Sequence, residues 1–97
     1  MLYAGSLVPR EVVACAAPQA MVVDSAPLTL EQCHALVRAT ALEGRPVARV
    51  HTGDPSLYGA LREQAALLDA DGIPWCVIPG VTAACAAAAA AGITFTV

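Results

Sequence analysis

The residues best suited to hold a small ligand lie in a loop at positions 51–59, which reads HTGDPSLYG. Gly53 and Gly59 allow the backbone to come close to a bound molecule. The segment 54–56 between them fixes a turn and offers a cap for the following helix. No Gly-Lys-Ser/Thr follows, and the spacing is not that of the dinucleotide motif Gly-x-Gly-x-x-Gly, so phosphate binding is disfavoured. Taken alone, the loop is equally consistent with a plain strand-to-helix connection.

A second loop, at positions 79–84, reads PGVTAA and precedes a segment that is almost entirely alanine. Thr82 and Ala83 stand where a helix is expected to begin. Free backbone N–H groups and the helix dipole attract an anion at such a position, for example the carboxylate of a ligand. The alternative is that Thr82 only caps the helix.

Both loops need a scaffold, and the sequence alternates between strand-like and helical segments. Strands separated by helices of about ten to fifteen residues cannot form hairpins, so we expect parallel pairing through right-handed crossovers. Thr29 and Gln32 form a capping box, and Gly44, Gly72 and Gly92 are expected to end helices. The predicted fold class is α/β, a parallel sheet whose ligands sit beyond the carboxyl ends of the strands. The expected strands are 1–4, 20–23, 46–51 and 75–78, and the expected helices are 9–17, 29–43, 61–71 and 83–91.

The composition allows one domain and predicts an unusually apolar surface. Apolar residues make up 58% of the 97 residues and charged residues only 13%, against roughly 25% charged residues in an ordinary soluble domain. We therefore expect missing chain or a partner subunit to cover part of the surface. The segment 1–4 reads as the end of a strand, so residues 1–97 are expected to form an incomplete domain. The net charge of −3, without a basic cluster, argues against a nucleic-acid partner.

The segment 75–97 contains no charged residue, which invites comparison with a membrane span. Pro79 and Gly80 interrupt this segment, Gly92 breaks it again, and alanine contributes far less transfer energy than leucine would. We expect a buried strand followed by a buried helix, and no membrane contact.

The cysteine spacing indicates neither a metal site nor a disulfide framework, because no Cys-x-x-Cys pair occurs. All of the cysteines lie in apolar segments and are expected to be buried thiols. Together with the lack of a signal peptide, they favour a reducing cytoplasm. They are Cys15, Cys33, Cys76 and Cys85.

The two loops, in this order and at this distance, resemble two signature segments of the tetrapyrrole methylases. Residues 2–9, LYAGSLVP, and residues 23–26, VDSA, are similar to the branch of that family that methylates C11. The resemblance implies methyl transfer from S-adenosylmethionine to a tetrapyrrole, namely precorrin-4 or cobalt-precorrin-4 in cobalamin biosynthesis. It also implies a homodimer, and it implies cofactor contacts at Thr52, Gly53, Asp54, Leu57, Thr82 and Ala83.

The resemblance covers nearly all of the chain but well under half of such an enzyme. The family's first strand, with its glycine-rich loop, and its C-terminal domain fall outside residues 1–97, so turnover by this chain alone is not expected. Two other interpretations stay open. One is a sister methylase acting on another precorrin carbon or on uroporphyrinogen, and the other is a non-catalytic fragment that only associates with a partner or with itself.

Methyl transfer asks little of side chains, because the sulfonium is already activated and the protein mainly positions the ring carbon and excludes water. A proton acceptor can be needed, and Ser6, Asp24 and His51 are polar residues at expected strand ends. A satisfied structural histidine is equally consistent with His51, and His34, within a helix, is interpreted as structural. Arg10 could meet a carboxylate of the tetrapyrrole, the alternative being a solvated helix residue. The sequence thus assigns no catalytic base and no metal ligand.

Overall fold

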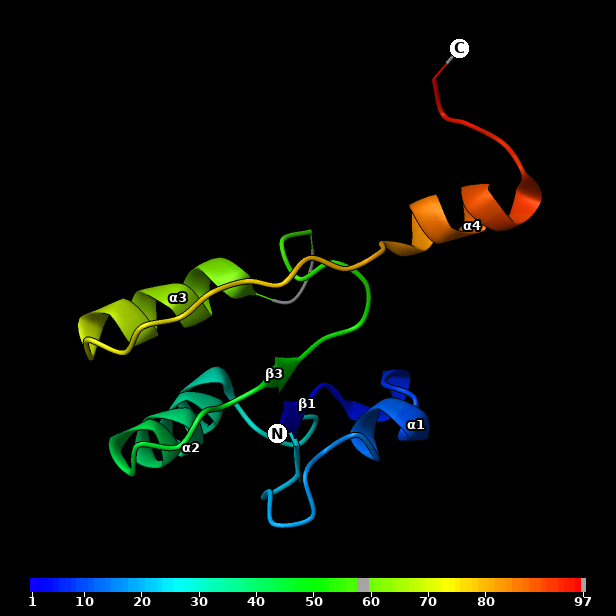
Figure 1. The fold of residues 1–97 in the computed structure, drawn as a ribbon. Helices are drawn as coiled ribbons and strands as arrows, with labels where there is room; N and C mark the ends of the chain where they lie inside the picture. Colours follow the sequence, from blue (N-terminus) through cyan, green and yellow to red (C-terminus); the bar gives the residue numbers. More distant parts are fainter. Residues whose placement is uncertain (58–59, 97) are drawn as a thin grey trace.

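The chain folds into a small parallel sheet with helices around it (Figure 1). The computed structural model describes residues 1–57 and 60–96, so Tyr58, Gly59 and Val97 of the sequence prediction lie outside the described residues. The elements are β1 (Leu2–Tyr3), the 3-10 helix η1 (Gly5–Leu7), α1 (Arg10–Val13), β2 (Val23–Asp24), α2 (Leu30–Leu42), β3 (Arg49–Val50), α3 (Leu61–Ala70) and α4 (Ala83–Ala91).

The sheet is parallel, as the lengths of the connections predict, and β1 lies at its centre. β2 and β3 pair with the two sides of β1, so that Leu2 has Val23 as its partner on one side and Arg49 on the other. Beyond β2, the Ser25 N–H donates to the Tyr3 carbonyl at 2.8 Å. The three strands run in one direction, so the loops that follow them leave the sheet at the same edge. The expected α/β class is confirmed.

Local signals in the sequence define the ends of the longer helices. The Thr29 hydroxyl accepts the Gln32 N–H at 3.1 Å, and the Gln32 side chain accepts the Thr29 N–H at 2.9 Å, which confirms the capping box of α2. Gly44, Gly72 and Gly92 stand just beyond the last residues of α2, α3 and α4, with φ of +76°, +67° and +69°. Glycine adopts this left-handed conformation without strain, so the predicted helix ends are confirmed as well.

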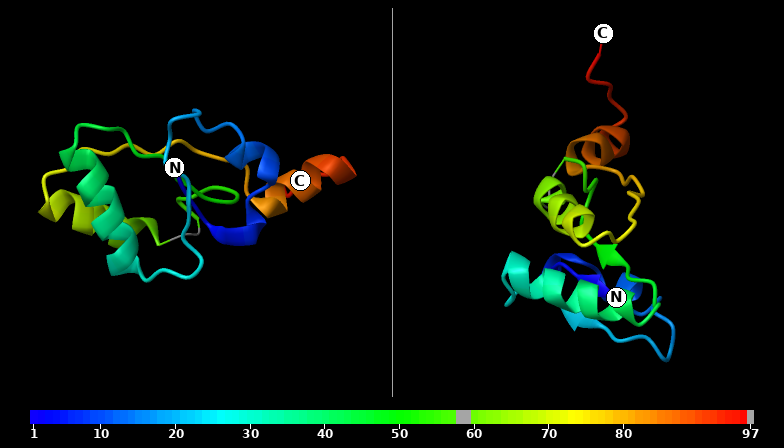
Figure 2. Two further views of the ribbon diagram at one scale, coloured as in Figure 1. Left: turned by 90° about the horizontal axis from the view of Figure 1, so that it is seen from below. Right: turned by 90° about the vertical axis from the view of Figure 1, so that its left-hand side faces the viewer.

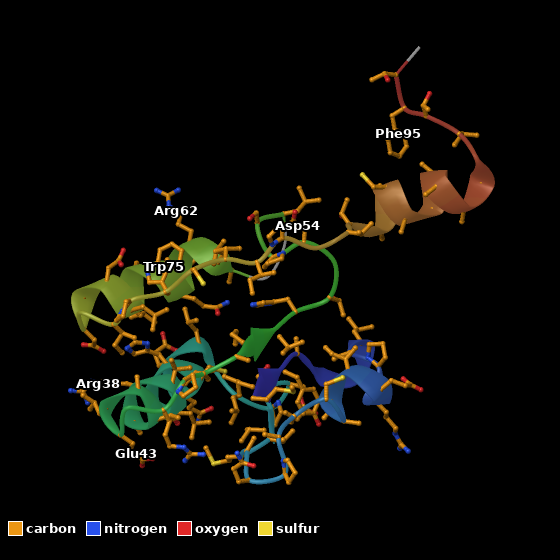
Figure 3. All side chains as sticks on the ribbon, viewed as in Figure 1. Arg38, Glu43, Asp54, Arg62, Trp75 and Phe95 are labelled. Carbon is orange, nitrogen blue, oxygen red and sulfur yellow. The ribbon has the colours of Figure 1, made fainter. Side chains whose placement is uncertain are left out.

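Helices α2 and α3 lie side by side and are joined through Asp71, which follows the last residue of α3 (Figure 1, Figure 2). The Asp71 carboxylate lies 2.6 Å from His34 Nε2 and 3.4 Å from Arg38 Nε, both on α2. His34 therefore has a structural role, as interpreted from the sequence. Trp75 Nε1 donates to the Asp69 carboxylate at 2.8 Å and ties the chain after α3 to that helix (Figure 3).

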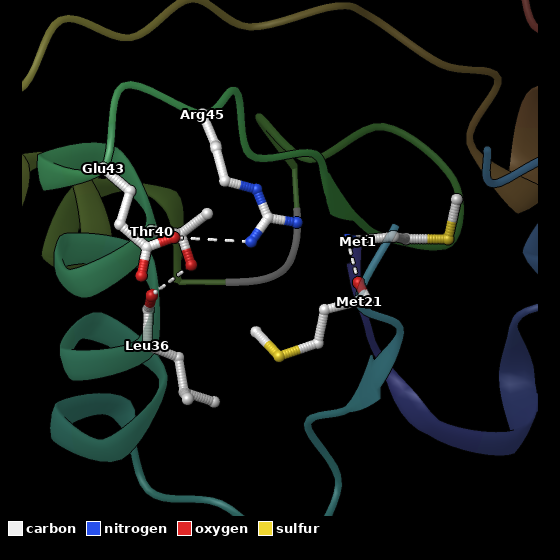
Figure 4. Close-up of polar contacts among 6 residues, drawn as sticks. All are labelled: Met1, Met21, Leu36, Thr40, Glu43 and Arg45. Carbon is white, nitrogen blue, oxygen red and sulfur yellow. Dashed lines mark hydrogen bonds and ion pairs between the residues drawn. The ribbon is translucent and has the colours of Figure 1, made fainter. Parts of the chain in front are cut away.

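The buried apolar core of the described residues is small and consists of Leu2, Val8, Cys33 and Ala88. A cavity of about 60 Å³ remains between the sheet and α2, which is too small for a cofactor. Figure 4 shows its surroundings. The N-terminal ammonium of Met1 donates to the Met21 carbonyl at 2.6 Å, and Arg45 pairs with Glu43 at 3.4 Å.

The paired parts of the strands, and α1, are shorter than the sequence predicts. Each strand has two paired residues, because β1 occupies only Leu2–Tyr3 and its neighbours can form a ladder only alongside it. α1 ends at Val13 instead of continuing to Ala17. The N–H groups of Cys15 and Ala16 bond to carbonyls three residues back, so the helix tightens into a turn.

The expectation of a buried strand at residues 75–78 is wrong. These residues run as extended chain (Figure 1), but no described strand lies beside them to form a ladder. Ile78 and Val81 are 80% and 68% exposed. A buried strand needs neighbours on both sides and a cover on each face, and the described part of the chain supplies neither.

The expectation of a buried alanine-rich helix is also wrong. α4 projects away from the sheet (Figure 1, Figure 2), and within it only Ala88 is buried. The radius of gyration is 15.2 Å, against about 13 Å for a globular chain of about 100 residues. Among the described helices, none has the length and apolar character needed to cross a membrane.

The thiols also differ from expectation, because only Cys33 is buried. Cys76 and Cys85 are exposed since they lie in the uncovered segment that contains α4. Cys15 follows the short α1, and its thiol donates to the Glu11 carbonyl at 3.3 Å from an exposed position. All of the cysteines are free thiols.

The capping box generates a first prediction. Thr29→Ala removes the oxygen that accepts the Gln32 N–H, so the free energy of opening of α2 should fall by about 1 kcal/mol and amide hydrogen exchange in its first turn should become about fivefold faster. Thr94→Ala is the matched control, because the Thr94 hydroxyl bonds to the Thr96 carbonyl near the end of the chain. Unchanged exchange in Thr29→Ala would show that the box does not stabilise α2.

Candidate functional site

The first loop forms a tight turn after β3. Gly53 has a φ of +68°, and the Asp54 carboxylate accepts the Ser56 N–H at 2.9 Å, while the Leu57 N–H donates to the Asp54 carbonyl at 3.0 Å. Residues 54–56 thus fix a turn, as expected, but they do not cap α3. The residue at that cap is Ala60, in the left-handed conformation and without a side-chain cap hydrogen bond, because α3 begins only at Leu61.

The second loop ends at the beginning of α4. Thr82 occupies the N-cap position in an extended conformation, and its carbonyl accepts the Ala86 N–H at 3.0 Å. Its hydroxyl makes no side-chain cap hydrogen bond, so capping alone does not account for this threonine. The N–H groups of residues 83–85, in the first turn, have no partner within the helix and point beyond its end.

The two loops, far apart in the sequence, touch each other through glycine backbone. A Cβ built on Gly80 would overlap the Gly53 carbonyl oxygen and lie 3.1 Å from the Gly53 carbonyl carbon and 3.6 Å from the Asp54 Cα. A Cβ built on Gly53 would lie 3.6 Å from the Thr82 Cα and 3.7 Å from the Val81 carbonyl oxygen. Figure 3 shows Asp54 beside the chain that leads into α4. Only glycine at position 80 permits this approach.

This contact brings most of the sequence-predicted cofactor residues to one place. Residues 52–54 and 82–83 lie where the loops meet, whereas Leu57 lies further along the first loop and is 58% exposed. Contact of these residues with a cofactor stays a prediction. The Gly80 contact itself was missed in the sequence, although the Pro-Gly pair at 79–80 is a signal for a close approach or a turn.

Arg49 is a second residue that the sequence reasoning missed. Its guanidinium lies on the sheet and donates to the Ser25 hydroxyl at 2.9 Å and to the Leu2 carbonyl at 3.4 Å, while the Ser25 hydroxyl donates to the Tyr3 carbonyl at 2.9 Å. Burial lowers the pKa of Arg49, and its Nε has no partner among the described residues. A lone arginine in a valine-rich strand was the available signal. Arg49 ties the three strands together below the first loop.

The candidate proton acceptors differ in how they are held. Burial, followed by the positive charge of Arg49, lowers the pKa of His51 below its usual value of 6.5, which favours the neutral ring at neutral pH. Within the described part of the chain, no group forms a hydrogen bond with the His51 ring. The Asp24 carboxylate accepts the Ala26 N–H at 2.8 Å. The Ser6 side chain lies outside the described atoms.

A shallow cleft, largely open to solvent, lies beyond the carboxyl ends of β1 and β2, beside α1. Among the described residues, no group of three or more His, Cys, Asp or Glu side chains could hold a metal ion. The cleft is lined by Tyr3, Gly5, Arg10, Val13, Ala14 and Asp24.

Comparison with known proteins identifies the family. The sequence model of the tetrapyrrole (corrin/porphyrin) methylases matches residues 2–97, and the chain belongs to this family. It is 53% identical over 89 residues to the precorrin-4 C(11)-methyltransferase of Mycobacterium tuberculosis (strain CDC 1551 / Oshkosh), a match that covers 92% of the chain and 36% of the relative. It is 43% identical over 97 residues to the cobalt-precorrin-4 C(11)-methyltransferase of Priestia megaterium, with 100% and 38% covered.

A solved structure has the same arrangement. The X-ray structure of a cobalamin biosynthetic enzyme, cobalt precorrin-4 methyltransferase, superposes with a TM-score of 0.94 at 44% identity, covering 99% of this chain and 40% of that one. The chain therefore spans well under half the length of the relatives it matches. The expected family resemblance and fold are both confirmed.

The glycine contact generates a second prediction. Gly80→Ala forces a methyl group against the Gly53 carbonyl, so the loops should separate at a cost of about 1–3 kcal/mol and amide exchange in residues 52–57 should become at least about fivefold faster. Gly72→Ala is the control, because a Cβ at Gly72 meets nothing within 4 Å and the strain of its positive φ stays at the end of α3. Equal exchange at 52–57 in both variants would contradict the contact.

Proposed function

We propose that the chain provides part of the S-adenosylmethionine site of a methyltransferase that acts on C11 of precorrin-4 or cobalt-precorrin-4. The observation that carries the proposal is the backbone contact between Gly53 and Gly80, because it joins both ligand-suited loops into one surface. The names of the two relatives and of the solved structure support the reaction and the substrate.

The groups at the loop junction suit the polar ends of this cofactor. The free N–H groups of residues 83–85 suit its carboxylate. Asp54 uses one carboxylate oxygen in its turn, and the other suits the cofactor's ammonium group or its hydroxyls. Gly53 has no side chain that would keep the cofactor away from the backbone. When bound, the cofactor supplies a methyl group activated on a sulfonium.

In this proposal the chain's own residues orient the methyl donor and take up a proton. Loop atoms that are fixed against each other can hold the donor in line with a ring carbon, which is the main requirement of the reaction. His51 can accept a proton at neutral pH, because its lowered pKa keeps the ring neutral. The Asp24 carboxylate is the second candidate acceptor at the same edge of the sheet.

The proposal for the whole protein goes beyond these residues. The chain matches 36% to 40% of the relatives' lengths. We therefore assign only cofactor contacts to residues 1–97, as an incomplete N-terminal domain, and we assign turnover to a longer protein. The proposal includes a tetrapyrrole substrate, a homodimer and a cytoplasmic location. It includes no nucleic-acid partner, since the net charge is −3.

A second candidate function is association without catalysis. Ile78, Val81 and Phe95 are 80%, 68% and 67% exposed, and an uncovered apolar surface favours contact with another protein surface. Strong self-association without cofactor binding would support this candidate instead.

The third prediction tests cofactor binding directly. Calorimetric titration of the purified chain with S-adenosylhomocysteine should show saturable binding, and Gly53→Val and Thr82→Val should each weaken it at least tenfold, or about 1.4 kcal/mol. Each substitution places a branched side chain at the junction of the loops. Thr94→Val is the matched control and should bind like wild type, because Thr94 lies beyond α4.

The outcomes separate the two candidate functions. If Gly53→Val and Thr82→Val lose binding while Thr94→Val keeps it, the result supports a cofactor site made by the two loops. No binding by a wild-type chain with helical circular dichroism would contradict the proposal for these residues. Sedimentation of the same sample then measures self-association.

A further inference from the structure

Arg49 brings a positive charge onto the sheet without a carboxylate to pair with. Its guanidinium is partly buried and donates to two uncharged oxygens, the Ser25 hydroxyl at 2.9 Å and the Leu2 carbonyl at 3.4 Å. Among the described residues, no ion pair includes Arg49, and its buried Nε has no partner. A partly buried cation without a counter-ion is costly, so its charge calls for an explanation beyond the bracing of the strands.

The register of the sheet explains why no carboxylate neutralises Arg49. Leu2 is aligned with both Arg49 and Val23, so these three side chains share one face of the sheet. Side chains alternate along a strand, and Asp24 therefore points to the other face. The carboxylates of Asp24 and Asp54 each accept the backbone N–H two residues further along the chain. The acidic groups near the strand ends thus leave the charge of Arg49 uncompensated.

His51 lies on the same face as Arg49. It directly follows β3 and stands two residues after Arg49, the spacing at which side chains of extended chain point to one side. Burial, and after it the charge of Arg49, lowers the pKa of His51. Burial lowers the pKa of Arg49 as well, while Cys33, a titratable group on α2, acts in the opposite direction. A protonated His51 would therefore meet the uncompensated charge of Arg49.

The hydrogen bonds of Arg49 fix the place of this charge. Ser25 is buried, and its hydroxyl accepts from Arg49 and donates to the Tyr3 carbonyl at 2.9 Å. The guanidinium is therefore held across β1, between the ends of β2 and β3. Solvent and salt screen the charge of a mobile, exposed arginine, whereas a held and partly buried charge acts more strongly on its neighbour.

We propose that Arg49 is a positioning residue for the proton acceptor of this site: its guanidinium holds the strand ends together and directs an uncompensated positive charge at His51, so that the ring meets the first loop as a base. The inference rests on the proposed function, because it names what prepares His51 for that reaction. A neutral imidazole has a nitrogen lone pair that can take up a proton, and an imidazolium has none. Arg49 acts only through His51 and touches neither cofactor nor substrate.

The test is a pH titration of the 13C- and 15N-labelled chain, followed by nuclear magnetic resonance of the histidine rings. Arg49→Gln keeps a donor for the Ser25 hydroxyl but removes the charge, so the pKa of His51 should rise toward its usual value of 6.5. Arg49→Lys keeps the charge and should leave the pKa of His51 low. Arg62→Gln is the matched control and should change nothing at His51, since Arg62 is exposed and points away from the body of the molecule on α3 (Figure 3).

A merely structural role for Arg49 predicts a different pattern. If Arg49 only braced the sheet, the His51 ring would respond alike to Arg49→Gln and Arg49→Lys. That result, or a response to Arg49→Gln no larger than the response to Arg62→Gln, would overturn the inference. The ring of His34 is an internal control, because it lies on α2 and pairs with Asp71 at 2.6 Å. Its signals should follow pH in the same way in every variant.

A second measurement needs no variant, so it decides the question even if Arg49→Gln does not fold. The interaction between two charged groups is reciprocal, and each reports the titration of the other. In the wild-type chain, the Nε signal of Arg49 should therefore shift with pH at the midpoint of the His51 ring, and the Nε signal of Arg62 should not. An Arg49 signal that stays in place while His51 titrates would overturn the inference.

Neither measurement contains cofactor, so this inference and the proposed function can fail separately. A His51 titration that depends on Arg49, in a chain that does not bind S-adenosylhomocysteine, would support the action of Arg49 on His51 and refute the cofactor site. Binding of S-adenosylhomocysteine by a chain whose His51 titration ignores Arg49 would support the cofactor site and overturn the inference.

Discussion

The close approach of the Gly53 and Gly80 backbones is the constraint on which the candidate site depends. Gly53 follows β3 and Gly80 precedes α4, so the contact joins the end of the sheet to the start of the last helix. It leaves no room for a Cβ at position 80. Without this contact, the free N–H groups of α4 and the turn at Asp54 would belong to separate parts of the molecule, and no single ligand could use both.

Below this contact, both polar groups and a small apolar core hold the sheet together. Arg49 reaches across β1 to the Ser25 hydroxyl, and Ser25 in turn donates to the Tyr3 carbonyl. The buried apolar set of the described residues is small, so these bonds matter for the position of the strand ends. Burial, and after it the positive charge of the same guanidinium, lowers the pKa of His51, the residue that begins the first loop. Sheet stability and the chemistry of the loop are therefore coupled through Arg49.

Features set by neighbours in the sequence could be predicted, and features set by distant contacts could not. The Thr29 capping box and the glycine at the end of α2 depend on a few adjacent residues, and both were predicted correctly. Residues 75–78 have the composition of a strand, but a strand exists only beside another one, and the described chain offers no neighbour. The exposure of Cys76 and Cys85 follows from the same lack of cover. The residues of the two candidate loops were predicted from the sequence. The contact between Gly53 and Gly80 was not, because it depends on the fold.

The segment around α4 follows the same path in a solved relative. The solved methyltransferase superposes on 99% of this chain with a TM-score of 0.94, and the match covers 40% of that longer chain. Sequence composition correctly indicated an apolar surface of this kind. Ile78, Val81 and Phe95 are prominent among the exposed residues that form this apolar surface.

The measurement that tests the central claim most directly is a nuclear magnetic resonance titration of the 15N-labelled chain with S-adenosylhomocysteine. If the two loops form one site, the amide signals of Gly53 and Asp54 and those of Thr82 and Ala83 should shift together and give one dissociation constant. Signals of α2 should stay in place. Shifts confined to one loop, or two different dissociation constants, would contradict the claim that the glycine contact makes a single cofactor site.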